Sequence, residues 1–206
     1  MKALPKKLLL LILFGIAFTS LVCVGPAQAY TVTLEQMGAN VVATGSGAFD
    51  LTGLAFNTSF TATGLSIVPN NPTIFTGAVP ATVSAYGDPN GFPFPGPASF
   101  GSGTGADASS GSGDFVGLGA LGGIVYVPNG YVSGNALSSS ATWDNATFAS
   151  LGVTPGTYVW SWGNGLPNQN FTLIIGGAGV PDGGSTVSLL GCALLGLAAL
   201  RRRLGC

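Results

Sequence analysis

Proline is spread through the middle of this chain and sets the strongest limit on its fold. Ten prolines lie between residues 30 and 179, at positions 69, 72, 80, 89, 93, 95, 97, 128, 155 and 167. A proline inside an α-helix costs about 3 kcal/mol relative to alanine, and a glycine about 1 kcal/mol. Glycine is also frequent, with 34 in the whole sequence. We therefore expect few helices in residues 30–179, which we call the body.

The body nevertheless contains the residue types that build a folded core. Only 6% of the chain is charged and 47% is hydrophobic, whereas disordered chains are usually highly charged and poor in large apolar residues. Short β-prone runs separated by turn residues are typical of all-β domains. We predict one all-β domain, an antiparallel sandwich or jelly-roll-like body, flanked by an N-terminal signal helix and a C-terminal transmembrane helix.

Runs of β-branched and aromatic residues locate the strands. Strands are expected at residues 31–34, 41–44, 49–60, 65–68, 79–86, 124–127 and 142–148. The dipeptide Asn129-Gly130 predicts a hairpin between residues 124–127 and 131–132, because Asn-Gly is a strong hairpin signal. Residues 87–113 contain several turn signals and a Gly/Ser tract, so they are expected to form a long irregular loop.

Residues 156–162 alternate strictly and place three aromatic side chains on one face of a strand, with residues 171–175 as its partner. The three are Tyr158, Trp160 and Trp162. They have two interpretations. Either they fill the core, where large rings supply much of the buried area, or they form an exposed ligand face on which sugar rings stack.

The first 29 residues have the composition of a secretory signal peptide. Lys2, Lys6 and Lys7 form its positive start, and residues 8–24 form an apolar run. The cleavage site is expected after Ala27-Gln28-Ala29, because small residues stand at Ala27 and Ala29, and the mature chain would begin at Tyr30. The chain is therefore predicted to be exported.

The last 27 residues have three parts: a short motif, an apolar run and a cationic end. The motif consists of Val180, Pro181, Asp182, Gly183, Gly184, Ser185 and Thr186. The uncharged run at residues 187–200 would be about 21 Å long as a helix, against a hydrocarbon core of about 30 Å, so it spans a membrane only marginally. Arg201, Arg202 and Arg203 follow it and would hold that end on the cytoplasmic side.

These three parts together resemble a PEP-CTERM-type sorting domain, and most closely its VPDSG-CTERM variant. The resemblance covers residues 180–206 and departs from the variant at Gly183, where serine is usual. It implies that the chain is the substrate of an exosortase-like membrane transpeptidase. It also implies a precursor tethered to the inner membrane of a Gram-negative bacterium, a mature form at the cell surface or in the extracellular matrix, and a link to exopolysaccharide.

Charge and residue content exclude several functions of the body. All six basic residues lie in the two terminal segments, so the body has no cation and its six carboxylates give a net charge of −6. Nucleic acid is excluded as a partner, because phosphate binding needs Lys or Arg. Without histidine, no Ser-His-Asp site can be assembled. No cysteine lies in the body, so neither a zinc site nor a disulfide is expected there.

Few residues of the body could catalyse a reaction or bind a metal ion. Asp107 and Asp114 are the nearest pair of carboxylates for glycoside hydrolysis, but they lie in a Gly/Ser tract that favours a solvated loop. Calcium could use Asp88, Asn90, Asp107 or Asp114, without an ordered ligand motif. We therefore expect no catalytic residue, no metal site, no cofactor and no enzymatic activity. The expected function is that of an exported surface or matrix protein, and the alternative is a carbohydrate-binding module or adhesin.

Overall fold

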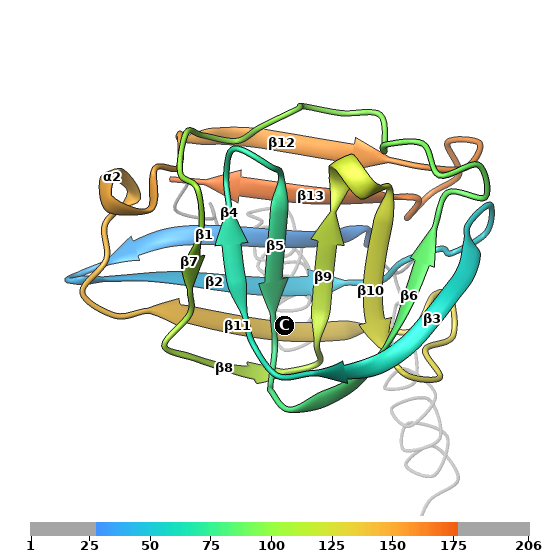
Figure 1. Ribbon diagram of the computed structural model, residues 1–206, viewed down its shortest axis with the longest axis horizontal. Coiled ribbons are helices and arrows are strands. Elements are labelled where there is room, and N and C mark those ends of the chain that lie inside the picture. The colour runs from blue at the N-terminus through green and yellow to red at the C-terminus, as the bar shows by residue number, and fades with distance from the viewer. Residues whose placement is uncertain (1–27, 177–206) are drawn as a thin grey trace, which may run out of the picture.

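The computed structural model describes residues 28–176, which form two β-sheets that face each other (Figure 1). Strands of one sheet run across those of the other in this view, as in crossed rather than aligned sheet packing. The predicted transmembrane helix at residues 187–200, the motif at 180–186, the three arginines and most of the signal segment lie outside the described residues. Within residues 28–176, no helix is long and apolar enough to cross a membrane.

The first sheet has six strands in the order β12-β13-β1-β2-β11-β8. Their bounds are β1 (Tyr30–Met37), β2 (Asn40–Gly47), β8 (Ser110–Gly113), β11 (Leu137–Trp143), β12 (Gly156–Ser161) and β13 (Asn170–Ile175). All neighbours are antiparallel except β1 and β13, which pair in parallel. The sheet therefore joins the two ends of the body side by side.

The second sheet has seven strands in the order β3-β6-β10-β9-β5-β4-β7, all paired antiparallel. Their bounds are β3 (Ala55–Ala62), β4 (Ser66–Val68), β5 (Thr73–Thr76), β6 (Ala81–Gly87), β7 (Ala106–Asp107), β9 (Val116–Gly119) and β10 (Ile124–Pro128). A short 3₁₀ turn, η2 (Ala120–Gly122), joins β9 to β10, and one helix, α2 (Phe148–Leu151), precedes β12.

The all-β prediction is confirmed, with two sheets rich in antiparallel pairs. β1 and β2 form a hairpin, and Gly38 is the first residue of its loop, with a φ of +62°. Type II′ hairpin turns favour glycine at this position. The predicted pairing of residues 156–162 with residues 171–175 is confirmed as β12 and β13.

The predicted hairpin at Asn129-Gly130 is wrong. β10 pairs with β6 on one side and β9 on the other, so no edge remains for residues 131–132. The dipeptide still turns the chain, because the Tyr131 amide donates to the Pro128 carbonyl at 3.0 Å. The chain then leaves the sheet, and the Tyr131 hydroxyl accepts from the Phe49 amide at 2.9 Å.

Three other predictions of local structure need correction. The strand predicted at residues 49–60 begins only at Ala55, where β3 starts. Residues 87–113 are not one irregular loop, because β7 and β8 lie within them. The predicted strand at 142–148 is correct only for residues 142–143, which end β11. A turn follows, and α2 then begins at Phe148, with Thr147 as the cap that accepts from the Ser150 amide at 3.0 Å. Gly/Ser strands such as β8 carry no β-propensity signal, and only pairing with β11 identifies this one.

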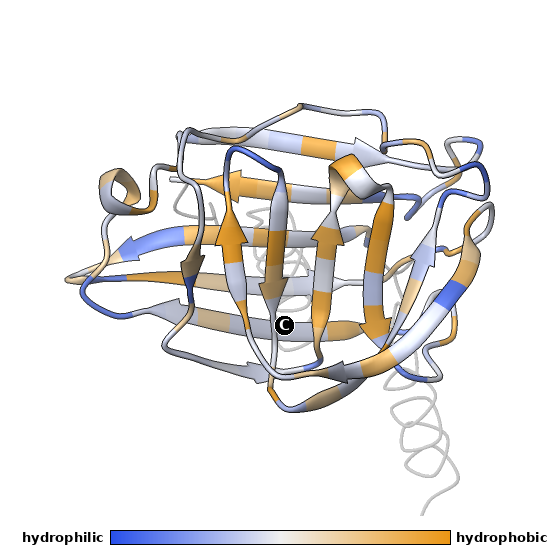
Figure 2. Cartoon of the chain, viewed as in Figure 1, coloured by the Kyte–Doolittle hydropathy of each residue, from blue (hydrophilic) through white to orange (hydrophobic). Residues whose placement is uncertain are grey.

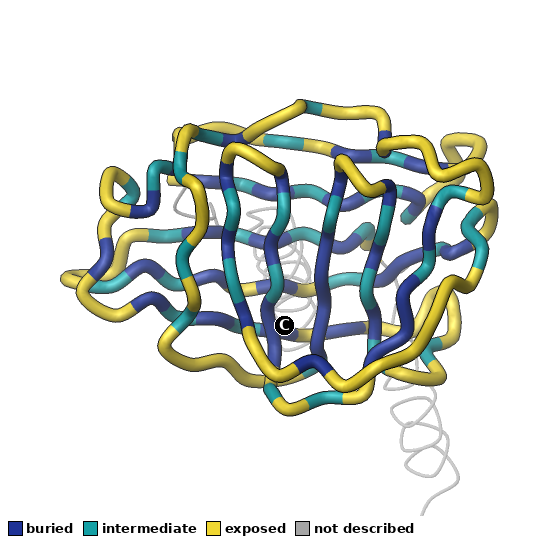
Figure 3. The backbone as a smooth tube through the Cα atoms, viewed as in Figure 1, coloured by how far each residue is buried: buried dark blue, intermediate teal, exposed yellow. Residues whose placement is uncertain are grey.

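The core lies between the sheets and consists of alternate residues of the strands. On β1, the side chains of Tyr30, Val32 and Leu34 are fully buried while their neighbours are partly exposed. Figure 2 shows hydrophobic residues concentrated on the crossing strands β5, β9 and β10, and Figure 3 shows buried positions along both layers. This alternation is the pattern of a sheet with one face in the core.

One hydrogen-bonded group crosses the core. The Tyr30 hydroxyl of β1 lies 2.5 Å from Ser139 Oγ of β11, and Ser139 Oγ lies 2.6 Å from Thr76 Oγ1 of β5. All three residues are at most 3% exposed. Burial raises the pKa of Tyr30 from 10.0 to about 12. This triad therefore ties the two sheets together through neutral hydroxyl groups.

Candidate functional site

The aromatic residues of β12, and Trp162 directly after it, pack into or against the core. Trp160 is 0% exposed and Trp162 is 4% exposed. Their indole N–H groups donate to the Pro97 and Asp50 carbonyls, each at 2.8 Å. Tyr158 is partly buried and stacks on Trp160 at 6.3 Å between ring centroids.

Pairing with β13 explains why these rings point inward. Trp160 lies opposite Phe171, and Tyr158 lies opposite Leu173, and opposed residues in an antiparallel pair share a face. Phe171 and Leu173 are buried. Alternation in the sequence placed the three rings on one face, but it did not show which face of the sheet meets the core. The structure favours the core interpretation over the ligand face.

The opposite face of the six-stranded sheet carries hydroxyl groups. Thr31 and Thr33 of β1 lie opposite Ser46 and Thr44 of β2 in register. The same rows continue to Ser138 and Ser140 of β11, and Thr172 of β13 lies beside Thr31. Neighbouring strands stand about 4.8 Å apart, so these side chains form a regular array that we call the hydroxyl face.

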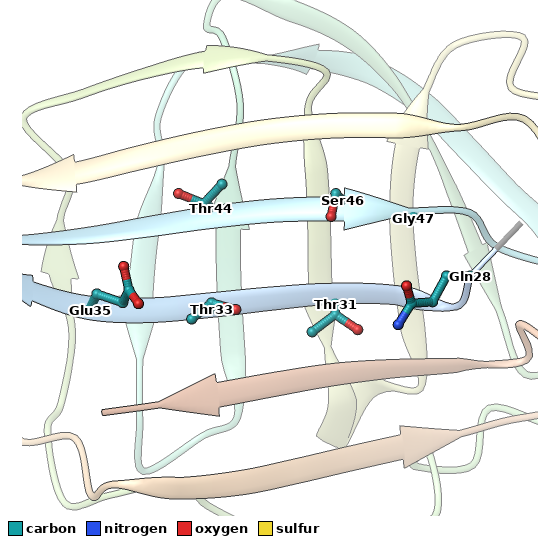
Figure 4. Close-up of a pocket in the computed structure, with 7 residues that line it drawn as sticks. All are labelled: Gln28, Thr31, Thr33, Glu35, Thr44, Ser46 and Gly47. Carbon is teal, nitrogen blue, oxygen red and sulfur yellow. The ribbon is translucent and has the colours of Figure 1, made fainter. Parts of the chain in front are cut away.

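A shallow trough of about 540 Å³ lies on this face. Its lining residues are Gln28, Thr31, Thr33, Glu35, Thr44, Ser46 and Gly47. Figure 4 shows these residues along β1 and β2, with Gln28 at one end of the row and Glu35 at the other. The trough was missed in the sequence, although Thr-x-Thr at 31–33 and Thr-x-Ser at 44–46 carry the signal.

The chemistry of the trough is that of hydrogen bonding to uncharged groups. Threonine and serine hydroxyls both donate and accept, and Glu35 adds one carboxylate. The body has no cationic side chain, so its negative charge disfavours anionic ligands. The trough therefore suits a neutral polar molecule, and its lining contains no histidine, lysine or cysteine.

The candidate carboxylates stand in separate places. Asp107 lies on β7 and pairs with Ser66 of the seven-stranded sheet. Asp114 follows β8, and its Oδ2 accepts from the Ser138 amide at 2.9 Å. Asp88 Oδ1 accepts from the Asn90 amide at 2.8 Å, which closes a turn. In residues 28–176, no three His, Cys, Asp or Glu side chains converge on a point suited to a metal ion.

The expected signal cleavage site adjoins the folded body. Ala29 forms a bridge with Ala48, and the Tyr30 amide donates to the Ala48 carbonyl at 3.1 Å. The Ala48 amide in turn donates to the Gln28 carbonyl at 2.9 Å. Ala27 lies outside the described residues. A mature chain that begins at Tyr30 would start directly with strand β1, and its first side chain would be in the core.

Comparison with known proteins identifies the C-terminal segment. Residues 179–204 match the VPDSG-CTERM motif, a variant of the PEP-CTERM-type sorting signal. No curated protein and no solved structure matches the chain. The match includes the seven motif residues and the three arginines, and such a motif indicates an exported protein that is sorted by the PEP-CTERM system.

Proposed function

We propose that this chain is a non-enzymatic surface or extracellular-matrix protein that an exosortase-like membrane transpeptidase processes at its C-terminus. The match of residues 179–204 to the VPDSG-CTERM motif carries this proposal. In this proposal the body is the exported domain, which is β-rich and contains no cysteine, and the tail is its sorting signal. We place the mature form at the surface of a Gram-negative cell, in association with exopolysaccharide.

In the proposed mechanism, the three parts of the tail act in order. Residues 187–200 form a membrane helix, and the arginines at 201–203 hold its end in the cytoplasm by the positive-inside bias. The motif then stands at the outer face of the inner membrane. Pro181 disfavours helix at Val180, and Asp182-Gly183-Gly184 favours a turn, so we expect an accessible backbone there. The thiol of the transpeptidase then attacks a peptide carbonyl of the motif, a thioester forms as the peptide C–N bond breaks, and the C-terminal part leaves with the new amine.

Two features of the body support delivery to a polysaccharide-rich exterior. The hydroxyl face presents Thr and Ser side chains in register over neighbouring strands, which suits hydrogen bonding to neutral sugar hydroxyls. The body also contains no cation, so it does not bind anionic surfaces through charge. We therefore place the proposed glycan contact on the outer face of the six-stranded sheet, and not at the rings of Tyr158, Trp160 and Trp162.

A pair of variants tests the sorting proposal. Pro181→Ala combined with Asp182→Ala changes the motif, while Pro167→Ala combined with Asp144→Ala changes the same two residue types in exposed parts of the body. In cells that contain the transpeptidase, the motif variant should accumulate as an unprocessed membrane form. The control variant should be processed like the unaltered chain. Equal processing of both variants would refute the role of the motif.

A further inference from the structure

The two sheets have four edge strands in the part of the chain that the structure describes, and three of them are short or covered. β12 is covered by residues 95–101, because the Ser161 amide donates to the Pro95 carbonyl at 3.0 Å. β7 has only two residues. β8 is met by residues 77–78, with the Ala78 amide donating to the Gly113 carbonyl at 3.0 Å.

β3 is the exception, because it is long and open. It has eight residues, it pairs with β6 alone, and its six central residues are all exposed. Figure 3 shows this exposure along the strand at the edge of the seven-stranded sheet. An open edge offers a row of backbone N–H and C=O groups to another strand.

The features that usually protect an edge strand are largely missing from β3. Its sequence, AFNTSFTA, contains no charged residue and no proline, although both are common in protected edges. One protective feature is present, a bulge at Asn57 where the register with β6 shifts. The bulge leaves residues 58–62 as a regular ladder of five residues.

An exposed aromatic side chain stands at the centre of this ladder. Phe60 is 44% exposed. Its ring meets Tyr126 of β10 edge to face at 6.0 Å, and Tyr126 meets Phe75 of β5 at 5.3 Å. The row of rings therefore ends at β3, where part of the last ring remains in solvent.

We propose that β3 is the interface at which a second copy of this chain adds edge to edge. Two β3 strands pair antiparallel across a two-fold axis at Phe60, so that residues 58–62 of each copy face the same residues of the other. One self-complementary pairing closes both open edges at once. Each Phe60 ring then packs against its symmetry mate, and the exposed part of the aromatic row is covered.

Charge favours a second copy as the occupant. β3 and the two strands next to it, β6 and β10, contain no charged residue. The body carries a net charge of −6, and two copies must keep their carboxylates apart. Contact through β3 places these uncharged strands of the two copies next to one another, so the pairing opposes no like charges on them.

The test is the oligomeric state of the full-length chain in detergent, measured by light scattering over a concentration series. Thr61→Lys places a cation on the open edge, next to Phe60, at an exposed position. Ser46→Lys is the matched control, because it adds the same cation at an exposed position of an interior strand in the other sheet. The unaltered chain and Ser46→Lys should dimerise alike, and Thr61→Lys should weaken dimerisation at least tenfold.

Hydrogen exchange of the unaltered chain gives a second test that needs no variant. Protection of the amides in residues 58–62 should fall when the protein is diluted below its dimerisation range, while the amides of β1 keep their protection. A monomer at all concentrations would overturn the proposal. So would a dimer that Thr61→Lys leaves unchanged or whose residues 58–62 show no concentration-dependent protection, because another surface would then hold the copies together.

Discussion

Replacement of the buried Tyr30 by phenylalanine should change the free energy of unfolding by an amount that follows from the contacts of its hydroxyl group. Tyr30→Phe removes one hydroxyl from the triad but leaves Ser139 bonded to Thr76 at 2.6 Å. Because no polar group loses its last partner, the cost at neutral pH should be that of one ordinary hydrogen bond, about 1 kcal/mol. For a domain of this size, such a loss lowers the melting temperature by about 2–4 °C.

Alkaline pH should reverse the order of stability. Burial raises the pKa of Tyr30 from 10.0 to about 12 in the folded chain, so the unfolded chain loses this proton first as the pH rises. The stabilisation by neutral Tyr30 is complete below pH 10 and is lost as the pH rises to about 12. A difference of two pKa units corresponds to about 3 kcal/mol. Tyr30→Phe has no such proton and should become the more stable protein near pH 12.

The assay is urea unfolding of both full-length proteins in detergent at several pH values between 7 and 12. Burial also raises the pKa values of Tyr126 and Tyr131, but these tyrosines remain in both proteins and cancel in the difference. The two curves of unfolding free energy against pH should converge above pH 10 and cross. Curves that stay parallel from pH 7 to 12 would refute the argument that the buried hydroxyl must remain neutral.

Two further substitutions test the packing around this core. Gly45→Ala would put a methyl group against the Tyr30 and Ser139 hydroxyls, so it should cost about 2 kcal/mol in thermal unfolding. Gly64→Ala, with no atom within 4 Å of the added carbon, should cost far less, and equal losses would contradict the assigned contact. Gln169→Ala removes a buried side chain that accepts from the Asn164 and Leu166 amides, each at 3.0 Å, so it should cost about 3 kcal/mol and expose residues 163–168 to protease. Unchanged protease resistance would show that the loop does not depend on this side chain.

The sequence predicted the elements whose signals are local. Runs of β-branched residues at 31–34 and 41–44 predicted strands that form parts of β1 and β2, and strict alternation in residues 156–162 predicted β12 and its partner. The hairpin at Asn129-Gly130 failed because β10 already has a partner on each side: β9, which precedes it after a short turn, and β6, which lies about 40 positions earlier in the chain. The parallel pairing of β1 with β13 has no local signal either, since it joins residues about 140 positions apart.

In the candidate site, too, the features with a local sequence signal could be predicted, and those that depend on other strands could not. Alternation placed Tyr158, Trp160 and Trp162 on one face, but the burial of that face depends on Phe171 and on the Pro97 carbonyl. The hydroxyl face was missed because single Thr-x-Thr patterns are common in exposed strands. Only the register across several strands shows that these short patterns form one array. The sorting motif could be identified in the sequence because its three parts are contiguous.

Whether the tail is processed can be measured as the intact mass of the protein recovered from cells, in membrane and extracellular fractions separately. Processing of the tail predicts an extracellular chain that begins at Tyr30 and ends within or just after residues 180–186. A chain that keeps residues 201–206 and remains wholly in the membrane fraction would contradict it, because the tail would then be a permanent anchor.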